Sequence, residues 1–326
     1  MDKLRFGIIG AGNIADSMAR TLSEMKEVCA YAISSREINR AKHLAEKYGF
    51  TVAYGSYDEM LQDEKVDVVY ISTPNSHHFT HAKAALLHGK HVVCEKTFTL
   101  NEAQARGLCD LAKSNGLFLM EAMWTRFMPF VPKLQELLRC GAIGDLCSMN
   151  VTFGINRPDR ERLFKAELGG GALLDLGLYP ITFATLIFGR DIENIGSAAV
   201  LNSDGVDTQH IITLRYHDGK MAVLHSSVVA NMSNQAIIYG TGGHIVVDRF
   251  WCAERILVYK DGEAKPQVYE FPFEINGYEY EIRAAVEDIN AGLLENDRMP
   301  HTETLRMMRL YDGLRREWGI VFPQEK

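Results

Sequence analysis

The first 120 residues alternate short apolar runs with amphipathic stretches, and this alternation constrains the fold more than any other feature. Each apolar run is about five residues long, which is typical of strands in a parallel sheet buried on both faces. We predict strands at Leu4–Ile9, Val28–Ile33, Thr51–Tyr54, Val66–Ile71, His91–Cys94 and Leu117–Met120. Helical spacing of apolar residues predicts helices between them, at Asn13–Met25, Arg36–Tyr48, Ser76–His88 and Glu102–Ser114.

The pattern changes after residue 122. A helix is predicted at Val131–Leu138, a strand at Leu146–Ile155, and a second helix at Ala172–Phe188 after three glycines. Six strand-like runs follow without helices between them, at Ile195–Leu201, Gln209–Tyr216, Met221–Val229, Ala236–Tyr239, Ile245–Asp248 and Ile256–Tyr259. Such a series predicts an antiparallel or mixed sheet. Helices near Glu279–Leu294 and Glu303–Trp318 close the chain.

We therefore expect an α/β protein with two domains. Residues 1–122 form a parallel sheet of the Rossmann type, and residues 123–326 form an α+β domain with an open, mostly antiparallel sheet. The length of 326 residues is also more typical of two hydrophobic cores than of one.

Composition excludes several classes of partner. The net charge is 35 minus 42, or −7, so the whole chain has no basic field to attract nucleic acid or anionic lipid. No apolar run is long enough to cross a bilayer, and the N-terminus does not resemble a secretory signal. Six scattered cysteines without C-x-x-C spacing predict reduced thiols and a cytoplasmic location. No His, Cys, Asp or Glu set has ligand spacing, so we expect no metal.

A glycine pattern follows the first predicted strand. Gly10 permits a tight turn, Gly12 lets the backbone approach a pyrophosphate, and Ala15 lets the helix pack on the sheet. Asn13 and Ile14 begin the helix, whose N-terminal N–H groups can bind phosphate. We predict a dinucleotide site here rather than a plain turn.

The end of the second strand favours NADP over NAD. NAD sites normally have an acidic residue here to bind the ribose 2′-hydroxyl. This chain has Ser35 and Arg36, with Arg40 one helical turn further on, and such groups suit a 2′-phosphate. The alternative is a solvated helix face paired with Glu37. NAD remains the second choice of cofactor.

Two more polar segments follow strands of the predicted parallel sheet. One contains Thr73, Pro74, Asn75 and His77, and the other contains Glu95 and Lys96. Open α/β sheets bind ligands at the carboxyl ends of their strands, so Lys96 is expected beside the nicotinamide. A lone lysine at a strand end is as often simply solvated.

These segments resemble the glucose–fructose oxidoreductase / inositol dehydrogenase (Gfo/Idh/MocA) family. Its marks are G-x-G-x-x-A, T-P-N-x-x-H, E-K-P and a later D-x-G-x-H/Y. The chain carries them at Gly10–Ala15, Thr73–His77, Glu95–Thr97 and Asp175–Tyr179. Glu121–Phe127 and Gly169–Tyr179 are similar to the branch of dihydrodiol dehydrogenases and NADP-dependent D-xylose dehydrogenases. The match spans almost the whole chain.

The chain departs from the family pattern twice. Thr97 replaces the usual proline, which leaves a cis Lys96–Thr97 peptide open, because a non-proline cis bond costs about 3 kcal/mol. Tyr179 stands where many relatives have histidine, which fits the dihydrodiol and xylose branch.

The resemblance implies Lys96, Asp175 and Tyr179 as catalytic groups. Asp175 and Tyr179 are four residues apart in a predicted helix and share a face. A nearby ammonium stabilises a tyrosinate and a developing alkoxide, so either Lys96 or Tyr179 can transfer the proton. Asp175 can orient Lys96 or bind the substrate hydroxyl. The alternative is that Asp175 pairs locally and Tyr179 is a core aromatic residue.

Aromatic residues are the candidates for a substrate wall. The resemblance implies Trp124 and Phe153, and Arg126 is a further candidate close to Trp124. Trp251 and Tyr278 are weaker candidates, because aromatic residues in strands more often belong to the core. The resemblance also gives His77 a role in positioning the nicotinamide ribose.

We expect an NADP-dependent dehydrogenase or reductase that transfers hydride to or from a small sugar, cyclic polyol or trans-dihydrodiol. Two alternatives remain: an NAD-retaining glycosidase of the same family, and a non-enzymatic cofactor-binding regulator. Ser35, Arg36 and Tyr179 argue against the first, and intact Lys96 and Asp175 against the second. The resemblance also implies a homodimer formed through the second sheet, alone or paired into a tetramer.

Overall fold

The computed structural model describes residues 3–325 and divides the chain into two compact units. Unit 1 comprises the chain up to Met123 together with Glu274–Asp312. Unit 2 comprises Trp124–Phe273 and the chain from Gly313 onward. The segment Glu274–Asp312 therefore belongs with the first unit, in contrast with the expected division at residue 122. The α/β class with two sheets is confirmed.

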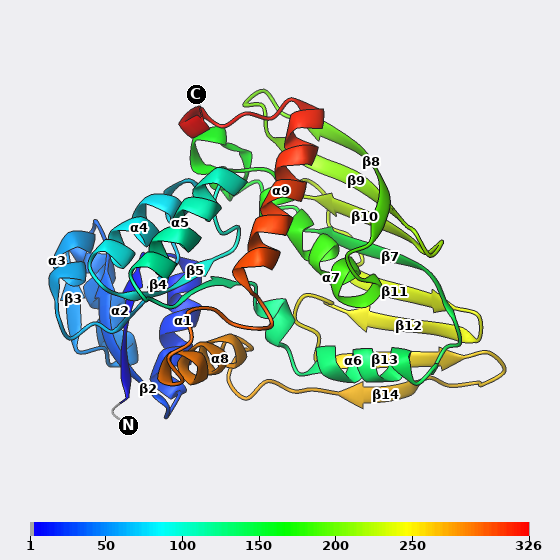
Figure 1. Ribbon diagram of the computed structural model, residues 1–326, viewed down its shortest axis with the longest axis horizontal. Helices are drawn as coiled ribbons and strands as arrows, with labels where there is room; N and C mark the ends of the chain where they lie inside the picture. Colours follow the sequence, from blue (N-terminus) through cyan, green and yellow to red (C-terminus); the bar gives the residue numbers. More distant parts are fainter. Residues whose placement is uncertain (1–2, 326) are drawn as a thin grey trace. The chain divides into compact units, whose positions relative to one another are not determined.

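Unit 1 is built on a six-stranded parallel sheet of order β3-β2-β1-β4-β5-β6 (Figure 1). The strands are β1 (Leu4–Ile9), β2 (Val28–Ser34), β3 (Val52–Tyr54), β4 (Val68–Ile71), β5 (His91–Glu95) and β6 (Leu119–Ala122). This is the order of a Rossmann sheet, in which the chain reverses direction between β1 and β4. All carboxyl ends of the strands lie at one edge.

The helices of unit 1 pack against this sheet and against one another. They are α1 (Asn13–Glu24), α2 (Ile38–Tyr48), α3 (Tyr57–Gln62), α4 (Asn75–Leu87), α5 (Glu102–Ser114), α8 (Glu279–Asn290) and the first part of α9 (His301–Trp318). Helix α1 packs against α2, and α4 packs against α5 (Figure 1). The short α3 was not predicted, because six residues are too few to show helical periodicity.

Long-range hydrogen bonds explain why the C-terminal segment joins unit 1. The Leu119 N–H donates to the Leu294 carbonyl, and the Thr304 hydroxyl donates to the buried Glu121 carboxylate at 3.0 Å. The Glu279 carboxylate accepts backbone N–H groups from residues 274–277, which orders the approach to α8. The pairs Leu119–Leu294 and Glu121–Thr304 are far apart in sequence, so periodicity did not indicate them.

Unit 2 contains an eight-stranded sheet of order β14-β13-β12-β11-β7-β10-β9-β8. Its strands are β7 (Leu146–Gly154), β8 (Ile192–Leu201), β9 (Asp207–Tyr216), β10 (Met221–Ser227), β11 (Gln235–Gly240), β12 (Gly243–Asp248), β13 (Arg255–Lys260) and β14 (Gln267–Glu270). Neighbours are antiparallel except β7 and β10, which are parallel. The mostly antiparallel sheet is confirmed. The edge strand β14 was not predicted, because it is short and mostly exposed.

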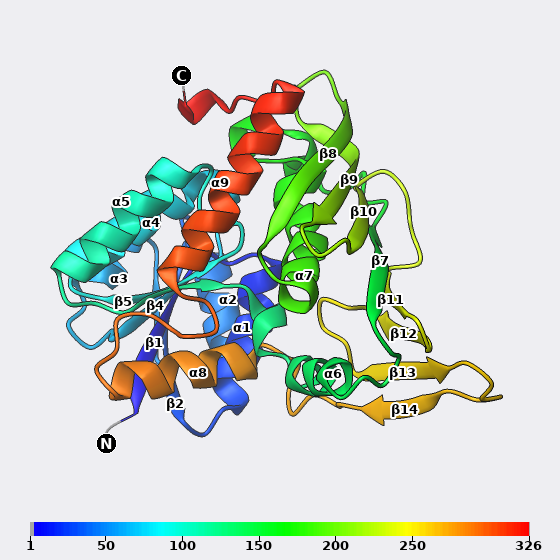
Figure 2. The same ribbon diagram turned by 45° about the vertical axis from the view of Figure 1, so that its right-hand side comes forward.

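Helices of unit 2 cover one face of this sheet (Figure 2). α6 (Phe130–Arg139) packs on β13, and α7 (Leu178–Phe188) packs on β7 and β10. Side chains under the helices, such as Ile212 and Leu224, are buried, whereas alternate residues such as Ile211 and Val223 are about two-fifths exposed. The opposite face of the sheet is therefore partly apolar and open.

The helix expected at Ala172–Phe188 is not regular. Leu173–Gly177 forms a π-helical turn, and α7 follows it directly. The stretch Ala166–Phe188 is long and apolar enough to span a bilayer, but 89% of its apolar window is buried within the chain. Burial of this kind is typical of a core helix.

Candidate functional site

The loop after β1 forms a cradle lined by glycine. Gly10 has a φ of +111°, and its N–H donates to the Ser34 carbonyl at 3.0 Å. A Cβ at Gly10 would lie 2.9 Å from Ser72 Oγ, whereas a Cβ at Gly12 would meet no atom within 4 Å. Gly12 caps α1 without a side-chain hydrogen bond. Gly12 has no side chain to accept the first N–H groups of α1, which begin at Asn13 and Ile14, and a helix N-terminus of this kind can bind a pyrophosphate.

Charged and polar groups at the end of β2 lie beside this cradle. The Arg40 Nη2 donates to the Ala11 carbonyl at 2.8 Å, so the side chain reaches the glycine loop from α2. Ser35 Oγ accepts the Glu37 N–H at 3.2 Å. The pairing considered as an alternative, between Arg40 and Glu37, is present at 3.7 Å but is largely exposed and therefore weak.

The loop after β4 leads into α4, and a histidine connects it to the loop after β5. The buried His78 ring lies 2.7 Å from the Thr73 carbonyl through Nε2 and 2.8 Å from the Thr97 carbonyl through Nδ1. Burial lowers the pKa of His78 to about 4, although the hydrogen bonds to the two carbonyl groups oppose this shift. Counted from Thr73, the histidine of the T-P-N-x-x-H pattern falls at His78. The assignment of that pattern to His77 was off by one residue.

His77 itself lies near a predicted cofactor residue. Partial burial, and then the positive charge of Arg36, lower the pKa of His77. Its ring centroid lies 5.8 Å from that of His81, whose Nδ1 contacts Thr73 Oγ1 at 3.1 Å. The structure therefore places Thr73, Arg36 and His77 in one neighbourhood of unit 1.

Buried acceptors hold the backbone around Lys96. The Tyr70 hydroxyl donates to Glu95 Oε1 at 2.5 Å, and the Lys96 N–H donates to Glu95 Oε2 at 3.2 Å. On the other side, the Phe98 N–H donates to Glu121 Oε1 at 3.3 Å. The Lys96–Thr97 peptide bond is cis, which answers the question that Thr97 left open. Tyr70, His78 and Glu121 were missed as site residues, because each acts through a partner distant in sequence.

In unit 2, the predicted polar pair lies among aromatic side chains. The Tyr179 hydroxyl accepts a hydrogen bond from Trp124 Nε1 at 3.1 Å. The Phe153 ring lies 5.6 Å from the Tyr179 ring and stacks on Trp251 at 3.9 Å with an interplanar angle of 11°. The structure thus brings Trp124, Phe153 and Trp251 together around Tyr179. Tyr278 belongs to unit 1 instead.

Asp175 has a cationic partner that sequence reasoning missed. Arg162 Nη1 lies 3.0 Å from Asp175 Oδ1, and the Asp175 side chain is only 10% exposed. Arg160 is half-buried in the same loop, and its burial, followed by the charges of Arg157 and Arg162, lowers its pKa. Arg126 is buried in a 3₁₀ turn. The predicted site residues of unit 2 therefore include a carboxyl group paired with arginine, a phenol and aromatic rings.

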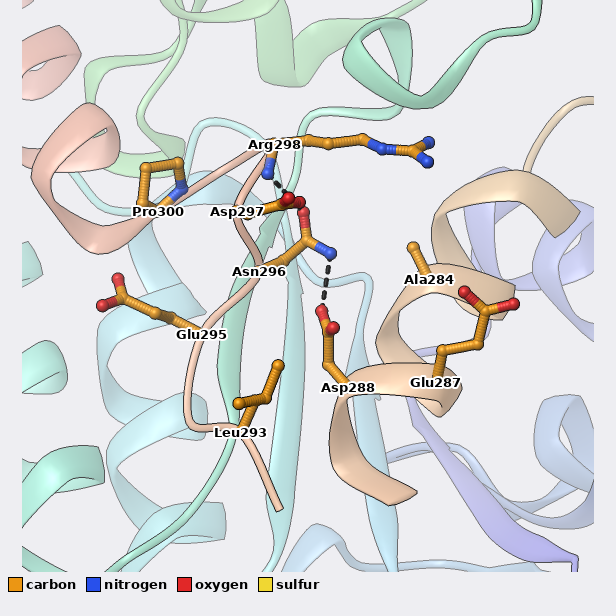
Figure 3. Close-up of a pocket in the computed structure, with 9 residues that line it drawn as sticks. All are labelled: Ala284, Glu287, Asp288, Leu293, Glu295, Asn296, Asp297, Arg298 and Pro300. Atoms are coloured by element: carbon orange, nitrogen blue, oxygen red, sulfur yellow. Dashed lines mark hydrogen bonds between the residues drawn. The ribbon is translucent and has the colours of Figure 1, made fainter. Parts of the chain in front are cut away.

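One cavity lies away from all these residues. It has a volume of about 500 Å³ and is formed by α8 and the loop after it in unit 1 (Figure 3). The Asn296 Nδ2 donates to Asp288 Oδ2 at 2.6 Å across it. It contains none of the predicted site residues. In the part of the chain that the structure describes, no three His, Cys, Asp or Glu side chains gather to hold a metal.

Comparison with known proteins identifies the class. Residues 4–123 match the family model "Oxidoreductase family, NAD-binding Rossmann fold", and residues 131–246 match "GFO/IDH/MocA C-terminal domain". The chain is 34% identical over 336 residues to the trans-1,2-dihydrobenzene-1,2-diol dehydrogenase of Mus musculus, which covers 99% of each chain.

Solved structures agree with this match. KijD10, a 3-ketoreductase from Actinomadura kijaniata in complex with NADP and TDP-benzene, has a TM-score of 0.88 and 28% identity, with 97% of this chain and 98% of that one covered. The aldose-aldose oxidoreductase from Caulobacter crescentus, 24% identical with a TM-score of 0.86 and 98% of each chain covered, shares the fold. The chain belongs to the Gfo/Idh/MocA oxidoreductase family, as its motifs indicated.

Proposed function

We propose that this protein is an NADP-dependent dehydrogenase or reductase. It moves hydride between the nicotinamide and a hydroxyl-bearing or carbonyl carbon of a small sugar, cyclic polyol or trans-dihydrodiol. The observation that carries the proposal is the N-terminus of α1 at Gly12, which has no side-chain cap and where a Cβ would meet no atom within 4 Å. Membership of an NAD-binding oxidoreductase family supports the same conclusion.

Residues of unit 1 are proposed to hold the cofactor. Gly10, Gly12, Asn13 and Ile14 would hold the pyrophosphate, and Ser35, Arg36 and Arg40 the 2′-phosphate. Further contacts to the cofactor are proposed for Thr73, Pro74, Asn75, His77, Glu95 and Lys96. When bound, NADP supplies or accepts the hydride at the nicotinamide. An NADP-bound relative of similar fold is consistent with this choice of cofactor.

Proton transfer is assigned to this chain's own side chains. During oxidation the substrate hydroxyl loses a proton, and Lys96 or Tyr179 is the proposed acceptor. In the reverse direction the same group donates. Asp175 is proposed to accept a hydrogen bond from the substrate, and Arg162 holds its carboxylate through an ion pair at 3.0 Å.

The composition of the cluster in unit 2 supports the substrate class. Trp124, Phe153 and Trp251 offer flat apolar surfaces beside the polar groups of Asp175 and Tyr179. Sugars, cyclic polyols and dihydrodiols all carry hydroxyls on a ring with apolar C–H edges or faces. Arg126 is a further proposed contact for the hydroxyls.

The decisive experiment follows reduced nicotinamide by its absorbance with NADP⁺ and NAD⁺ against a panel of aldoses, cyclic polyols and trans-dihydrodiols. Turnover that prefers NADP⁺ supports the proposal. Tightly retained NAD with cleavage of glycosides would instead indicate the glycosidase alternative. Cofactor binding without turnover across the panel would indicate a regulator.

We also propose that the open face of the second sheet binds a second copy of the chain. Val200, Ile211, Met221, Val223 and Val268 are each at least 40% exposed on this sheet. An exposed apolar face of this kind is normally buried against a partner, and the same face of a second copy is a self-complementary partner. Six free cysteines are consistent with the proposed cytoplasmic location.

A further inference from the structure

The segment that carries Asp175 departs from α-helical geometry. Leu173–Gly177 makes a π-helical turn, and Tyr179 lies two residues beyond its end in α7. Turns of this kind are rare and occur often at functional sites. Two side chains of β9, Asp207 and His210, lie against this turn.

Asp207 holds the beginning of the turn. Its side chain is buried, and Oδ2 accepts hydrogen bonds from the Leu173 N–H and from His210 Nδ1, both at 2.8 Å. Because an ionised carboxylate only accepts hydrogen bonds, Nδ1 carries the imidazole proton. Gly171, just before the turn, has a φ of +113°, and a Cβ there would lie 2.5 Å from Asp207 Oδ1.

His210 lies against the end of the turn. A Cβ at Gly177 would lie 2.5 Å from both Cε1 and Nε2 of His210, so the glycine allows the close approach. The imidazole stacks on Trp318 at 5.3 Å with an interplanar angle of 27°. Trp318 is itself held by a hydrogen bond from Nε1 to Ser197 Oγ at 2.8 Å. His210 is therefore confined between an anchored indole and the backbone of the turn.

We propose that Asp207 and His210 are positioning residues that set the places of Asp175 and Tyr179 by holding both ends of the π-turn. The inference rests on the proposed function, in which Asp175 and Tyr179 take part in the reaction. It also gives a reason for the two flanking glycines: Gly171 and Gly177 leave room for Asp207 and His210. A displacement of about 1 Å in a reacting group can lower a rate about a hundredfold.

The first test compares Asp207→Ala with Asp207→Asn. The Ala variant loses both hydrogen bonds, so kcat should fall about ten- to a hundredfold. An amide oxygen can still accept from Leu173 and His210, so the Asn variant should recover most of the activity. The NADPH dissociation constant should change by less than about threefold, because the proposed cofactor residues belong to unit 1.

A double-mutant cycle tests the other end of the turn. Gly177→Ala should lower kcat, because the new methyl group meets His210. In a His210→Ala background the same methyl has room, so the double variant should be no less active than His210→Ala alone. Thr241→Val is the control, since it removes a hydroxyl that accepts the Asp145 N–H in a turn of the same unit. Its kcat should stay within about twofold of the wild type.

Asp175→Asn, measured alongside, separates the two proposals. If Asp175→Asn abolishes turnover while Asp207→Ala keeps a near-normal kcat, the positioning role is wrong and the proposed function stands. Independent, additive losses in the Gly177 and His210 cycle would overturn it as well. If Asp175→Asn is itself fully active, the role of Asp175 in the reaction and the positioning role both fail, whereas NADP-linked turnover by the wild type would still support the proposed function. Unfolding midpoints of each variant show whether a loss of kcat reflects a smaller folded fraction, and the cycle remains decisive even if Asp207→Ala does not fold.

Discussion

Individual side chains in this protein explain cofactor choice. Arg40 reaches from α2 to the Ala11 carbonyl, which places a guanidinium against the glycine loop after β1. The pKa of His77 is lowered mainly by burial and further by the positive charge of the nearby Arg36. Two cations and a small hydroxyl residue, Ser35, occupy the place where NAD-specific proteins have an acid.

We predict that Arg36→Ala and Arg40→Ala each weaken NADP binding about tenfold or more, because each removes a charge-assisted contact to the 2′-phosphate. The dissociation constant for NAD should change less than about threefold. Both constants can be measured by titration of protein fluorescence. Lys42→Ala, an exposed cation on the same helix, is the control. Equal losses for the two cofactors would remove the 2′-phosphate interpretation.

A second residue-scale prediction concerns Glu281 of α8. Both of its carboxylate oxygens are buried, and neither has a hydrogen-bond partner among residues 3–325. Burial, followed by the negative charge of Glu95, raises the pKa of Glu281 well above its ordinary value of 4.5. The folded protein therefore holds this proton more tightly than the unfolded chain does. The resulting stabilisation is complete below pH 4.5 and is lost as pH rises through the folded-state pKa.

Because Glu281→Gln is always neutral, its stability relative to the wild type should increase as pH rises above 4.5. The free energy of unfolding, measured with denaturant at a series of pH values, tests this. Glu287→Gln removes an exposed carboxyl from the same helix and should show no such trend. A constant difference between Glu281→Gln and the wild type at every pH would show that Glu281 does not hold a proton in the folded state.

At the scale of elements, the turn between β1 and α1 contains two glycines with different roles. Gly10 is needed for the fold, because its φ is +111° and a side chain would meet Ser72. Gly12 has no such constraint from the protein, since a Cβ there meets nothing within 4 Å. Packing therefore does not require glycine at residue 12, and we infer that a ligand approaches the backbone there.

Gly10→Ala should consequently affect the stability of the protein, whereas Gly12→Ala should affect cofactor binding. We expect Gly10→Ala to destabilise the apo protein by about 1–3 kcal/mol. Gly12→Ala should leave the free energy of unfolding within about 0.5 kcal/mol of the wild type but weaken NADP binding about tenfold. Denaturant unfolding and cofactor titration check the two effects. If Gly12→Ala binds NADP normally, the pyrophosphate does not lie against this turn.

Much of this element arrangement was predictable from periodicity. The strands of both sheets and most helices were found within a few residues, because alternating and helical patterns mark buried faces. The short α3 and β14 and the π-turn at Leu173–Gly177 were not, since each is too short for a period to appear.

The side chains that support the candidate site could not be predicted from the sequence either. Asp207, His210, Arg162 and His78 act through partners brought together by the fold. Motifs identify residues at strand ends, such as Lys96, but not the side chains that hold them. The family pattern was sufficient to propose Asp175 and Tyr179, and the structure was needed to find the hydrogen-bond and ion-pair partners of these two residues.

At the scale of the whole molecule, the two units carry different candidate functional surfaces. Unit 1 has the glycine cradle and the loops at its strand ends, whereas unit 2 has the aromatic cluster on one side of its sheet and an open apolar face on the other. Val223 lies on β10, between β7 and β9, and is 40% exposed on that open face. It is therefore a suitable place to test whether the face binds a second copy.

We predict that the wild type sediments as a dimer or a dimer of dimers, and that Val223→Asp dissociates it. A buried carboxylate in an apolar interface is costly, whereas the isolated sheet tolerates the charge at an exposed position. Sedimentation velocity measures the assembly, and circular dichroism should show an unchanged fold. A wild type that remains monomeric at high concentration would contradict the proposed interface.

In the proposed NADP-linked reaction Lys96 takes part in proton transfer, either as the acceptor or by stabilising the tyrosinate of Tyr179, and Lys96→Met tests this most directly. We predict that kcat falls at least about a hundredfold, because the variant keeps the length of the side chain but loses its proton-transfer group. The NADPH dissociation constant, measured in parallel by fluorescence, should change less than about fivefold. Near-normal turnover by Lys96→Met would contradict the account.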